Sequence, residues 1–239
     1  MTSVSLPLTT RLRPREGLVA APVPPTQPKI GLSGQVGRRK LAKLALREAA
    51  GAAPNILMAW ERDLHLPRCI LLNGTSSSGK STIARELQER LPVLYLNFSI
   101  DSVLYALPPS DLQAMIKGQP ITRSEYEYDR LVRGFHAAIS GLLGAGNRVI
   151  VDNAITRDAW RDDFDAAVAP YPCFRVGVMC DIEVARQRER VRRDRAIGTV
   201  DREFHRVHRR MGYDLEVDTT PKSAIQSARA ITAGLGLLD

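Results

Sequence analysis

Residues 74–81 read Gly-Thr-Ser-Ser-Ser-Gly-Lys-Ser, and this stretch decides the fold of the chain. It matches the phosphate-loop pattern G-x-x-x-x-G-K-[ST] at every specified position. The apolar run RCILLN at residues 68–73 precedes it, and residues 81–90 have the composition of a helix. A glycine-rich loop between a strand and a helix presents backbone N–H groups to phosphate oxygens. The stretch therefore predicts a nucleotide-binding α/β domain.

The residues of this loop have separate tasks. Gly74 and Gly79 let the backbone turn its N–H groups toward the phosphates. Lys80 supplies a positive charge for the β- and γ-phosphates, and the Ser81 hydroxyl is a ligand for Mg²⁺. We therefore expect ATP and Mg²⁺ as cofactors, although a loop that binds phosphates does not distinguish ATP from GTP. The other expected nucleotide contacts in and after the loop are Thr75, Ser76, Ser77, Ser78 and Thr82.

Four further apolar runs follow the phosphate loop. They cover residues 93–98, 148–151, 174–180 and 215–217, and sequence of helical composition separates them. Strands that alternate with helices predict βαβ units and a parallel sheet. The expected fold is a nucleoside-monophosphate-kinase-like P-loop NTPase, an α/β domain with a parallel sheet of about five strands flanked by helices.

Two carboxylates follow predicted strands, and each has two interpretations. Asp152 closes the run RVIVD, which is a Walker-B-like pattern for holding Mg²⁺, but an acid at a strand end also caps turns. Asp101 follows the second strand, where a carboxylate can accept the proton of an acceptor hydroxyl. It is equally placed to be the N-cap of the next helix. Three tyrosines after it belong either to a substrate pocket or to the core: Tyr105, Tyr126 and Tyr128.

An arginine-rich helix is expected over residues 182–195. Arg188, Arg192 and Arg195 recur at a spacing that places them on one helix face, as a mobile lid over a transferring phosphoryl group requires. The alternative is a solvated helix whose arginines pair with nearby acids. A second basic run at residues 205–210 is interpreted as a solvated face without chemistry, and its two histidines lack a third metal ligand nearby.

The N-terminal part of the chain differs from the rest in composition. Residues 1–36 are rich in Pro, Ser and Thr and are expected to be a disordered tail. Residues 37–66 predict a basic helical extension, and residues 67–239 the P-loop kinase domain. Residues 1–66 hold ten of the 34 Lys and Arg but four of the 26 Asp and Glu. The net charge of +8 therefore lies mainly outside the kinase domain, so nucleic acid is not an expected partner.

Cysteine usage and hydropathy indicate a cytoplasmic protein. The chain has three cysteines, an odd number, and no C-x-x-C pair, which fits a reducing compartment better than a disulfide scaffold or zinc site. No apolar run reaches the roughly 18 residues of a membrane helix. The sequence does not indicate an oligomeric state.

With these motifs assembled, the chain resembles chloramphenicol phosphotransferase and its relatives among the P-loop kinases over roughly residues 68–235. The resemblance rests on CILLNGTSSSGKS, IDSV, VIVD, RERVRRDR and YDLEVDTT, which begin at residues 69, 100, 149, 188 and 213. The last two stretches are the more discriminating ones. Residues 103–130, where an acceptor would bind, do not match well.

The resemblance implies an ATP- and Mg²⁺-dependent kinase of a small-molecule hydroxyl. It implies Asp101 as the base, Lys80, Arg188 and Arg192 as catalytic residues, and Ser81 and Asp152 as metal ligands. It also implies that Arg188, Arg192 and Arg195 lie on the lid side of ATP, and that Thr219 and Thr220 lie near the nucleotide base. The resemblance does not identify which of these arginines contacts the γ-phosphate.

The expected function is inactivation of an antibiotic such as chloramphenicol by O-phosphorylation. One alternative is a P-loop kinase of another acceptor, such as a nucleotide-sugar or a nucleoside. A second is a nucleotide-dependent binding or regulatory protein that uses its basic N-terminal segment.

Overall fold

A computed structural model describes residues 66–192 and 194–237. The predicted tail over residues 1–36 lies outside the described residues, as does the predicted helical extension over 37–66 except for Leu66. Within the described part of the chain, no helix is long and apolar enough to cross a membrane.

Five parallel strands form one sheet in the order β2-β3-β1-β4-β5. This confirms the predicted fold class. The five strands are β1 (Cys69–Asn73), β2 (Leu96–Ser99), β3 (Val149–Asn153), β4 (Cys173–Met179) and β5 (Leu215–Asp218). The register pairs Asp152 with Leu72 of β1 and with Ser99 of β2, so the phosphate loop, the end of β2 and Asp152 meet at one edge of the sheet.

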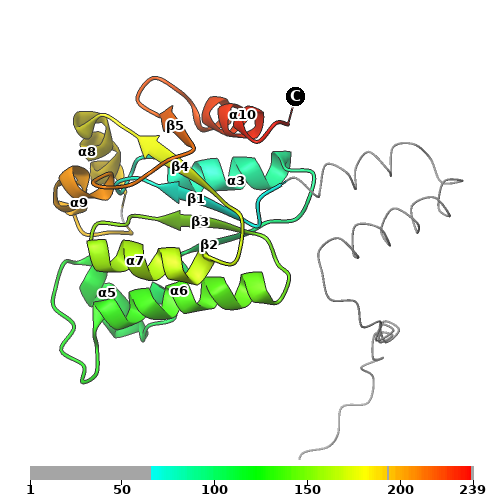
Figure 1. Ribbon diagram of the computed structural model, residues 1–239. Coiled ribbons are helices and arrows are strands. Elements are labelled where there is room, and N and C mark those ends of the chain that lie inside the picture. Colours follow the sequence, from blue (N-terminus) through cyan, green and yellow to red (C-terminus); the bar gives the residue numbers. More distant parts are fainter. Residues whose placement is uncertain (1–65, 193, 238–239) are drawn as a thin grey trace, which may run out of the picture. The chain divides into compact units, whose positions relative to one another are not determined.

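Helices cover both faces of the sheet. Figure 1 shows α3 and α10 on one face and α6 and α7 on the other, while α8 and α9 lie beyond the carboxyl ends of the strands. The described helices are α3 (Lys80–Arg90), α4 (Ile100–Leu104), α5 (Pro109–Ile116), α6 (Tyr128–Gly144), α7 (Asp158–Val168), α8 (Ile182–Val191), α9 (Thr199–Val207) and α10 (Ala224–Gly234).

The central strands β1 and β3 are mainly apolar because both of their faces are buried, whereas the edge strands β2 and β5 contain polar residues and are partly exposed. In β1, Ile70 and Leu72 pack in the cluster under α3 and α10, while Cys69 and Leu71 pack in the cluster under α6 and α7. All five residues of β1 and all five of β3 are buried. This rigid sheet holds the loops at its carboxyl edge in place.

The arginine-rich segment differs from the predicted helix over 182–195. Helix α8 ends at Val191, and Arg192 has an extended backbone with ψ of 141°. The Glu189 side chain accepts hydrogen bonds from the N–H groups of Gly198 and Val200 at 3.0 and 2.9 Å. Because this buried carboxylate draws the following turn back onto α8, the chain reverses and enters α9 at Gly198, which has a φ of 88°.

Candidate active site

The phosphate loop joins β1 to α3 and is shaped by its two glycines. A Cβ atom at Gly74 would lie 2.5 Å from the carbonyl oxygen of Val178, so only glycine lets the loop pass this close to β4. Gly79 has a φ of 96°, which the β-carbon of other residues disfavours. The side chains of Thr75, Ser76 and Ser78 are buried in this turn. The structure thus reproduces the strand, loop and helix that the motif requires.

Lys80 is the first residue of α3 and lies inside the loop. Its ammonium donates to the carbonyl oxygens of Gly74 and Thr75 at 2.9 and 2.8 Å, and lies 3.8 Å from a carboxylate oxygen of Asp152. Only 7% of Lys80 is exposed. Burial lowers its pKa, and the nearby Asp152 carboxylate opposes that shift. The Lys80 ammonium is therefore held at the loop by neutral carbonyl groups and makes no direct hydrogen bond to the Asp152 carboxylate.

Ser81 and Asp152 form a pair of oxygen donors beside Lys80. Ser81 Oγ donates to Asp152 Oδ2 at 2.5 Å. A hydroxyl and a carboxylate oxygen beside a phosphate loop are ligands of the type that Mg²⁺ prefers. Among the described residues, no group of three or more His, Cys, Asp or Glu could hold a metal ion. Such a two-ligand site fits an ion that takes its remaining ligands from phosphates and water.

Asp101 lies in the first turn of α4 rather than at its cap. The N-cap is Ser99, and the Ser102 hydroxyl accepts a hydrogen bond from the Ser99 N–H at 3.4 Å. The Asp101 carboxylate is therefore free of a capping role, and it faces a pocket at the edge of the sheet.

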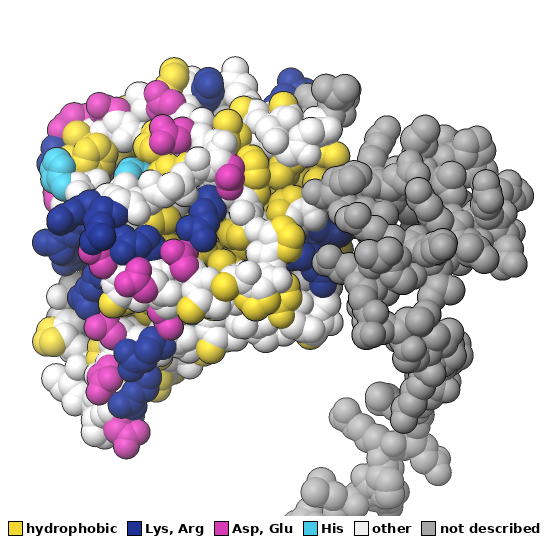
Figure 2. All heavy atoms as spheres, in the orientation of Figure 1, with side chains coloured by type: hydrophobic (Ala, Val, Ile, Leu, Met, Phe, Trp, Pro, Cys, Tyr) yellow, Lys and Arg dark blue, Asp and Glu magenta, His cyan; other side chains and the backbone are white. Residues whose placement is uncertain are grey.

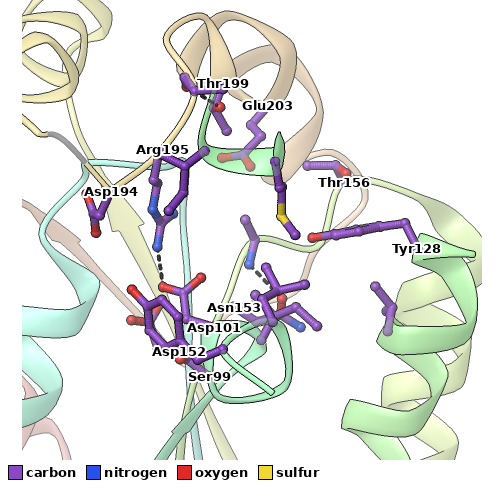
Figure 3. A pocket seen from close by; sticks show the side chains of 18 of the residues that line it. Ser99, Asp101, Tyr128, Asp152, Asn153, Thr156, Asp194, Arg195, Thr199 and Glu203 are labelled. Atoms are coloured by element: carbon purple, nitrogen blue, oxygen red, sulfur yellow. Dashed lines mark hydrogen bonds and ion pairs between the residues drawn. The ribbon is translucent and has the colours of Figure 1, made fainter. Parts of the chain in front are cut away.

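Arg195 connects Asp101 to the phosphate loop. One terminal nitrogen of its guanidinium pairs with Asp101 Oδ2, and the other donates to Ser76 Oγ at 3.1 Å. Figure 3 shows this arginine reaching from the turn before α9 down to Asp101. A guanidinium held between a carboxylate and a phosphate loop is placed to contact a terminal phosphate.

Arg192 lies on the same side of the loop. Its guanidinium makes two hydrogen bonds with Asp194, at 3.0 and 2.7 Å. This pairing raises the pKa of Arg192 and lowers that of Asp194 to about 2. Arg192 and Arg195 line a small pocket of about 50 Å³ together with Ser77, Gly79, Lys80, Ser81, Thr82 and Asp152.

Arg188 is separate from the other two arginines. Its guanidinium donates to the Thr219 carbonyl at 2.8 Å and to Cys180 Sγ at 3.4 Å. The Thr219 hydroxyl in turn donates to the carbonyls of Ser78 and Met179, at 2.8 and 2.9 Å. Thr220 follows, and its hydroxyl accepts from the Asp181 N–H at 2.8 Å. Arg188 therefore joins α8 to the turn after β5, and this turn flanks the phosphate loop.

A pocket of about 310 Å³ opens beside Asp101, and we call it the acceptor pocket. Its apolar wall comes from α4, α5, α6 and α7, and its polar wall from the phosphate-loop side and α9 (Figure 3). Tyr105 and Tyr128 line it, whereas Tyr126 does not. The apolar wall consists of Leu104, Leu112, Met115, Ile116, Val132 and Trp160.

Glu203 is a site residue that sequence reasoning missed. Its carboxylate accepts a hydrogen bond from the Ser76 N–H at 2.6 Å and lines the acceptor pocket. Burial raises its pKa, while the Lys80 ammonium opposes the shift. Burial, with Glu203 and Asp101 nearby, also raises the pKa of Tyr128 to about 12. The sequence signal that could have identified Glu203 is an acidic residue within a basic amphipathic helix, directly after Arg202.

The arrangement combines three capacities at one edge of the sheet. The loop at residues 74–81 can bind a polyphosphate, Ser81 and Asp152 can hold a divalent cation, and Asp101 can take a proton from a group in the acceptor pocket. A hydroxyl placed there would lie between a base and the end of a phosphate chain, which is the geometry of phosphoryl transfer.

Comparison with known proteins gives the family of the chain. The family model described as "Chloramphenicol phosphotransferase-like protein" matches residues 67–235. Two proteins from the strains CDC 1551 / Oshkosh and H37Rv of Mycobacterium tuberculosis bear the name "Putative O-phosphotransferase". Each is 29% identical over 180 residues, which is 69% of this chain and 80% of the relative.

Solved structures of kinases share the fold. A sugar kinase from Janibacter sp. HTCC2649 superposes with a TM-score of 0.55 at 16% identity, over 71% of this chain and 94% of that one. The APS kinase of Mycobacterium tuberculosis in complex with AMPPNP and APS gives 0.53 at 16% identity, over 72% and 98%. A gluconokinase from Sinorhizobium meliloti gives 0.51 at 20% identity, over 70% and 91%. The fold is that of the P-loop kinases.

Proposed function

Because this chain belongs to the chloramphenicol phosphotransferase-like family, we propose that it transfers the γ-phosphoryl group of ATP to a hydroxyl group of a small molecule with the help of Mg²⁺. Family and fold make it a phosphotransferase with a hydroxyl acceptor. The observation that carries the proposal is the position of Asp101. It lies in the acceptor pocket and is joined to the phosphate loop through one arginine.

Each residue of the site has a task in this reaction. Lys80 and the loop N–H groups bind the phosphates, and Ser81 and Asp152 hold the metal ion. Mg²⁺ held by Ser81 and Asp152 would neutralise part of the phosphates' negative charge. Asp101 orients the acceptor hydroxyl and accepts its proton as the oxygen–phosphorus bond forms. The bond from the γ-phosphorus to the bridging oxygen breaks, and ADP leaves.

Arg195 must change partner for this reaction to proceed. In the structure its guanidinium is bound to Asp101 Oδ2, an oxygen that the acceptor hydroxyl would need to reach. A γ-phosphate at the loop offers the guanidinium more negative charge than one carboxylate does. We therefore assign Arg195 two positions, on Asp101 in the free protein and on the γ-phosphate in the complex. Arg192 shares the phosphate side of the site.

The acceptor that the pocket favours is an amphiphilic alcohol. Apolar side chains from four helices form one wall and charged groups the other, as a ring-bearing antibiotic such as chloramphenicol would require. We therefore propose antibiotic inactivation as the leading function. Nucleosides and nucleotide-sugars are the alternative acceptors, and use of ATP as donor favours a cytoplasmic location.

The test is transfer to a panel of hydroxyl-bearing antibiotics, nucleosides and nucleotide-sugars in the presence of ATP and Mg²⁺. Mass spectrometry of the acceptor would detect an added phosphoryl group. A phosphorylated compound is the expected result. ATP hydrolysis without any phosphorylated acceptor would instead favour a nucleotide-dependent binding or regulatory protein, and binding partners of residues 1–66 would be the next subject.

A further inference from the structure

A second pocket, which we call the arginine pocket, lies where the start of α7 meets the end of α9. It has a volume of about 370 Å³. The residues that define it are Thr156, Arg157, Asp158, Arg161, Arg206 and Arg209. Figure 2 shows a dense field of Lys and Arg side chains on this part of the surface. Arg206 and Arg209 of the basic run at 205–210 are exposed, as expected for a solvated face, and they line this pocket together with arginines of a distant segment.

The arginine pocket has more positive than negative charge. Arg157 pairs with Asp129 at 2.8 and 2.9 Å, and Arg161 pairs with Asp158 at 2.9 Å. The same Asp158 carboxylate also binds Arg210 at 2.7 Å. Arg161 binds Asp162 as well, at 3.1 Å, outside the pocket lining.

Two of the pocket's arginines lack an acidic partner. Arg206 and Arg209 make no ion pair with any of the described residues 66–192 and 194–237. Four guanidiniums therefore line the pocket with one carboxylate between them. An anion bound among them would be attracted to all four guanidiniums, which could donate hydrogen bonds to it.

The arginine pocket adjoins the acceptor pocket. Thr156 lines both. Helix α9 borders both pockets. Arg202 lines the acceptor pocket, and Arg206, one helical turn later, lines the arginine pocket. A molecule whose hydroxyl lies at Asp101 can therefore extend past Thr156 toward the guanidiniums.

We propose that the arginine pocket binds a phosphate or carboxylate group carried by the acceptor, so that the acceptor is an anionic alcohol. This inference rests on the proposed function and narrows its substrate class: alcohols that carry an anionic group should be better acceptors than neutral ones such as chloramphenicol. The planar, forked donors of arginine match both of these anions. Asp158 in the pocket, with Asp129 and Asp162 beside it, would repel a continuous polyanion, so the charge pattern fits a single compact anion better than a nucleic acid.

The first arm of the test measures anion binding by itself. Inorganic phosphate is titrated calorimetrically into the full chain after its phosphate loop has been filled with Mg²⁺ and a non-hydrolysable ATP analogue. The test variant is Arg206→Gln/Arg209→Gln, and the control Arg85→Gln/Arg190→Gln removes the same charge from exposed positions of α3 and α8. We expect saturable binding in the wild type and the control, and a weakening of at least about tenfold in the test variant.

The second arm uses matched alcohols with and without an anionic group, such as a nucleoside and its 5′-monophosphate, in the transfer assay. The anionic member should be preferred. The test variant should raise its KM at least about tenfold with little change in kcat, and should leave the neutral member unaffected. Preference for neutral acceptors, or a KM that the test variant does not alter, would overturn the assignment.

The two arms separate this inference from the proposed function. Failure to phosphorylate any alcohol would contradict the proposed function, but the phosphate titration would still decide whether the pocket binds anions. No phosphate binding, or binding that the test variant retains, would refute the arginine pocket whatever the transfer assay shows. Salt-dependent binding of duplex nucleic acid that the test variant abolishes would also overturn the assignment to a small acceptor.

Discussion

The guanidinium of Arg195 pairs with the carboxylate of Asp101 while it also donates to the Ser76 hydroxyl of the phosphate loop at 3.1 Å. One side chain thus joins the three parts of the site: the turn after α8, the loop that binds phosphate and the carboxylate that faces the acceptor. While this ion pair is in place, the guanidinium occupies a carboxylate oxygen that an acceptor hydroxyl would need, and a bound phosphate would compete for the guanidinium. This relationship predicts that proton transfer depends on the presence of nucleotide.

Replacing Arg195 should impair transfer more than binding. Arg195→Lys keeps one positive charge but cannot hold Ser76 and Asp101 together with a planar fork. We expect kcat to fall by about 10²–10³-fold, in the range seen when one transition-state donor is lost, with a smaller change in KM for ATP. Steady-state kinetics would measure both constants. Arg190→Lys, at an exposed position of α8, is the control, and equal kcat values for the two variants would refute the role.

Removing the Ser81 hydroxyl should raise the requirement for Mg²⁺. Ser81→Ala deletes one oxygen ligand and leaves Asp152 without its 2.5 Å hydrogen bond. We expect the Mg²⁺ concentration for half-maximal activity to rise by about tenfold or more. A Mg²⁺ titration at fixed ATP would measure it, with Ser140→Ala on α6 as the control. An unchanged Mg²⁺ dependence would place the ion elsewhere.

Glu203 should make the folded state less stable as pH rises. Burial raises the pKa of its carboxyl group above the ordinary value for glutamic acid. Below the ordinary pKa, the Glu203 carboxyl group is neutral in both the folded and the unfolded state, so it does not lower the free energy of unfolding. As pH rises, this carboxyl group ionises first in the unfolded chain, which lowers the free energy of unfolding. The loss of stability reaches its full size above the folded-state pKa. Glu203→Gln keeps an oxygen for the Ser76 N–H, so it should raise Tm near neutral pH and leave it unchanged near pH 4.

Thermal unfolding across this pH range would test the sign of the effect. The exposed Glu89→Gln on α3 is the control and should show no pH-dependent gain. A Glu203→Gln variant that is less stable than the wild type at neutral pH would show that the attraction of Lys80 exceeds the cost of burial, contrary to the prediction.

Glu189 should determine the stability of the turn that carries Arg195. Its two carboxylate oxygens accept from Gly198 and Val200, and only 4% of the residue is exposed. Glu189→Ala leaves two N–H groups without their partner and should cost roughly 1–3 kcal/mol of stability. Glu189→Gln keeps only one acceptor and should lie between the alanine variant and the wild type.

Hydrogen exchange would localise this effect. The Gly198 and Val200 amides should exchange faster in Glu189→Ala, and kcat should fall because Arg195 is less well positioned. The control is Glu183→Ala, an exposed position on the same helix. Wild-type exchange rates in the turn would mean that Glu189 does not anchor it.

The sheet and the phosphate loop could be predicted because their signals are local. The central strands are short apolar runs buried on both faces, and residues 74–81 carry a motif that is complete within eight residues. The predicted positions of Ser81 and Asp152 meet for the same reason, since the register of β1 and β3 brings the two strand ends together.

The course of the segment after α8 could not be predicted because it depends on tertiary contacts. The composition of residues 182–195 predicts one helix, yet α8 ends at Val191, where Gly198 and Val200 donate hydrogen bonds back to Glu189. Arg188 therefore lies beside Thr219, away from Arg195. Glu203 and the arginine pocket were missed for a related reason. The sequence around a charged residue does not indicate which residues of a distant segment will lie opposite it in the folded protein.

The most direct test of the account is whether phosphate passes from ATP to an alcohol through Asp101. ³¹P NMR of a reaction with Mg²⁺, ATP and the best acceptor would follow ADP, free phosphate and the new phosphate ester together. The wild type should form phosphate ester in proportion to ADP. The Asp101→Asn variant should bind ATP as the wild type does but transfer phosphate about 10²–10⁴-fold more slowly. Ester formation at the wild-type rate in Asp101→Asn would contradict the account.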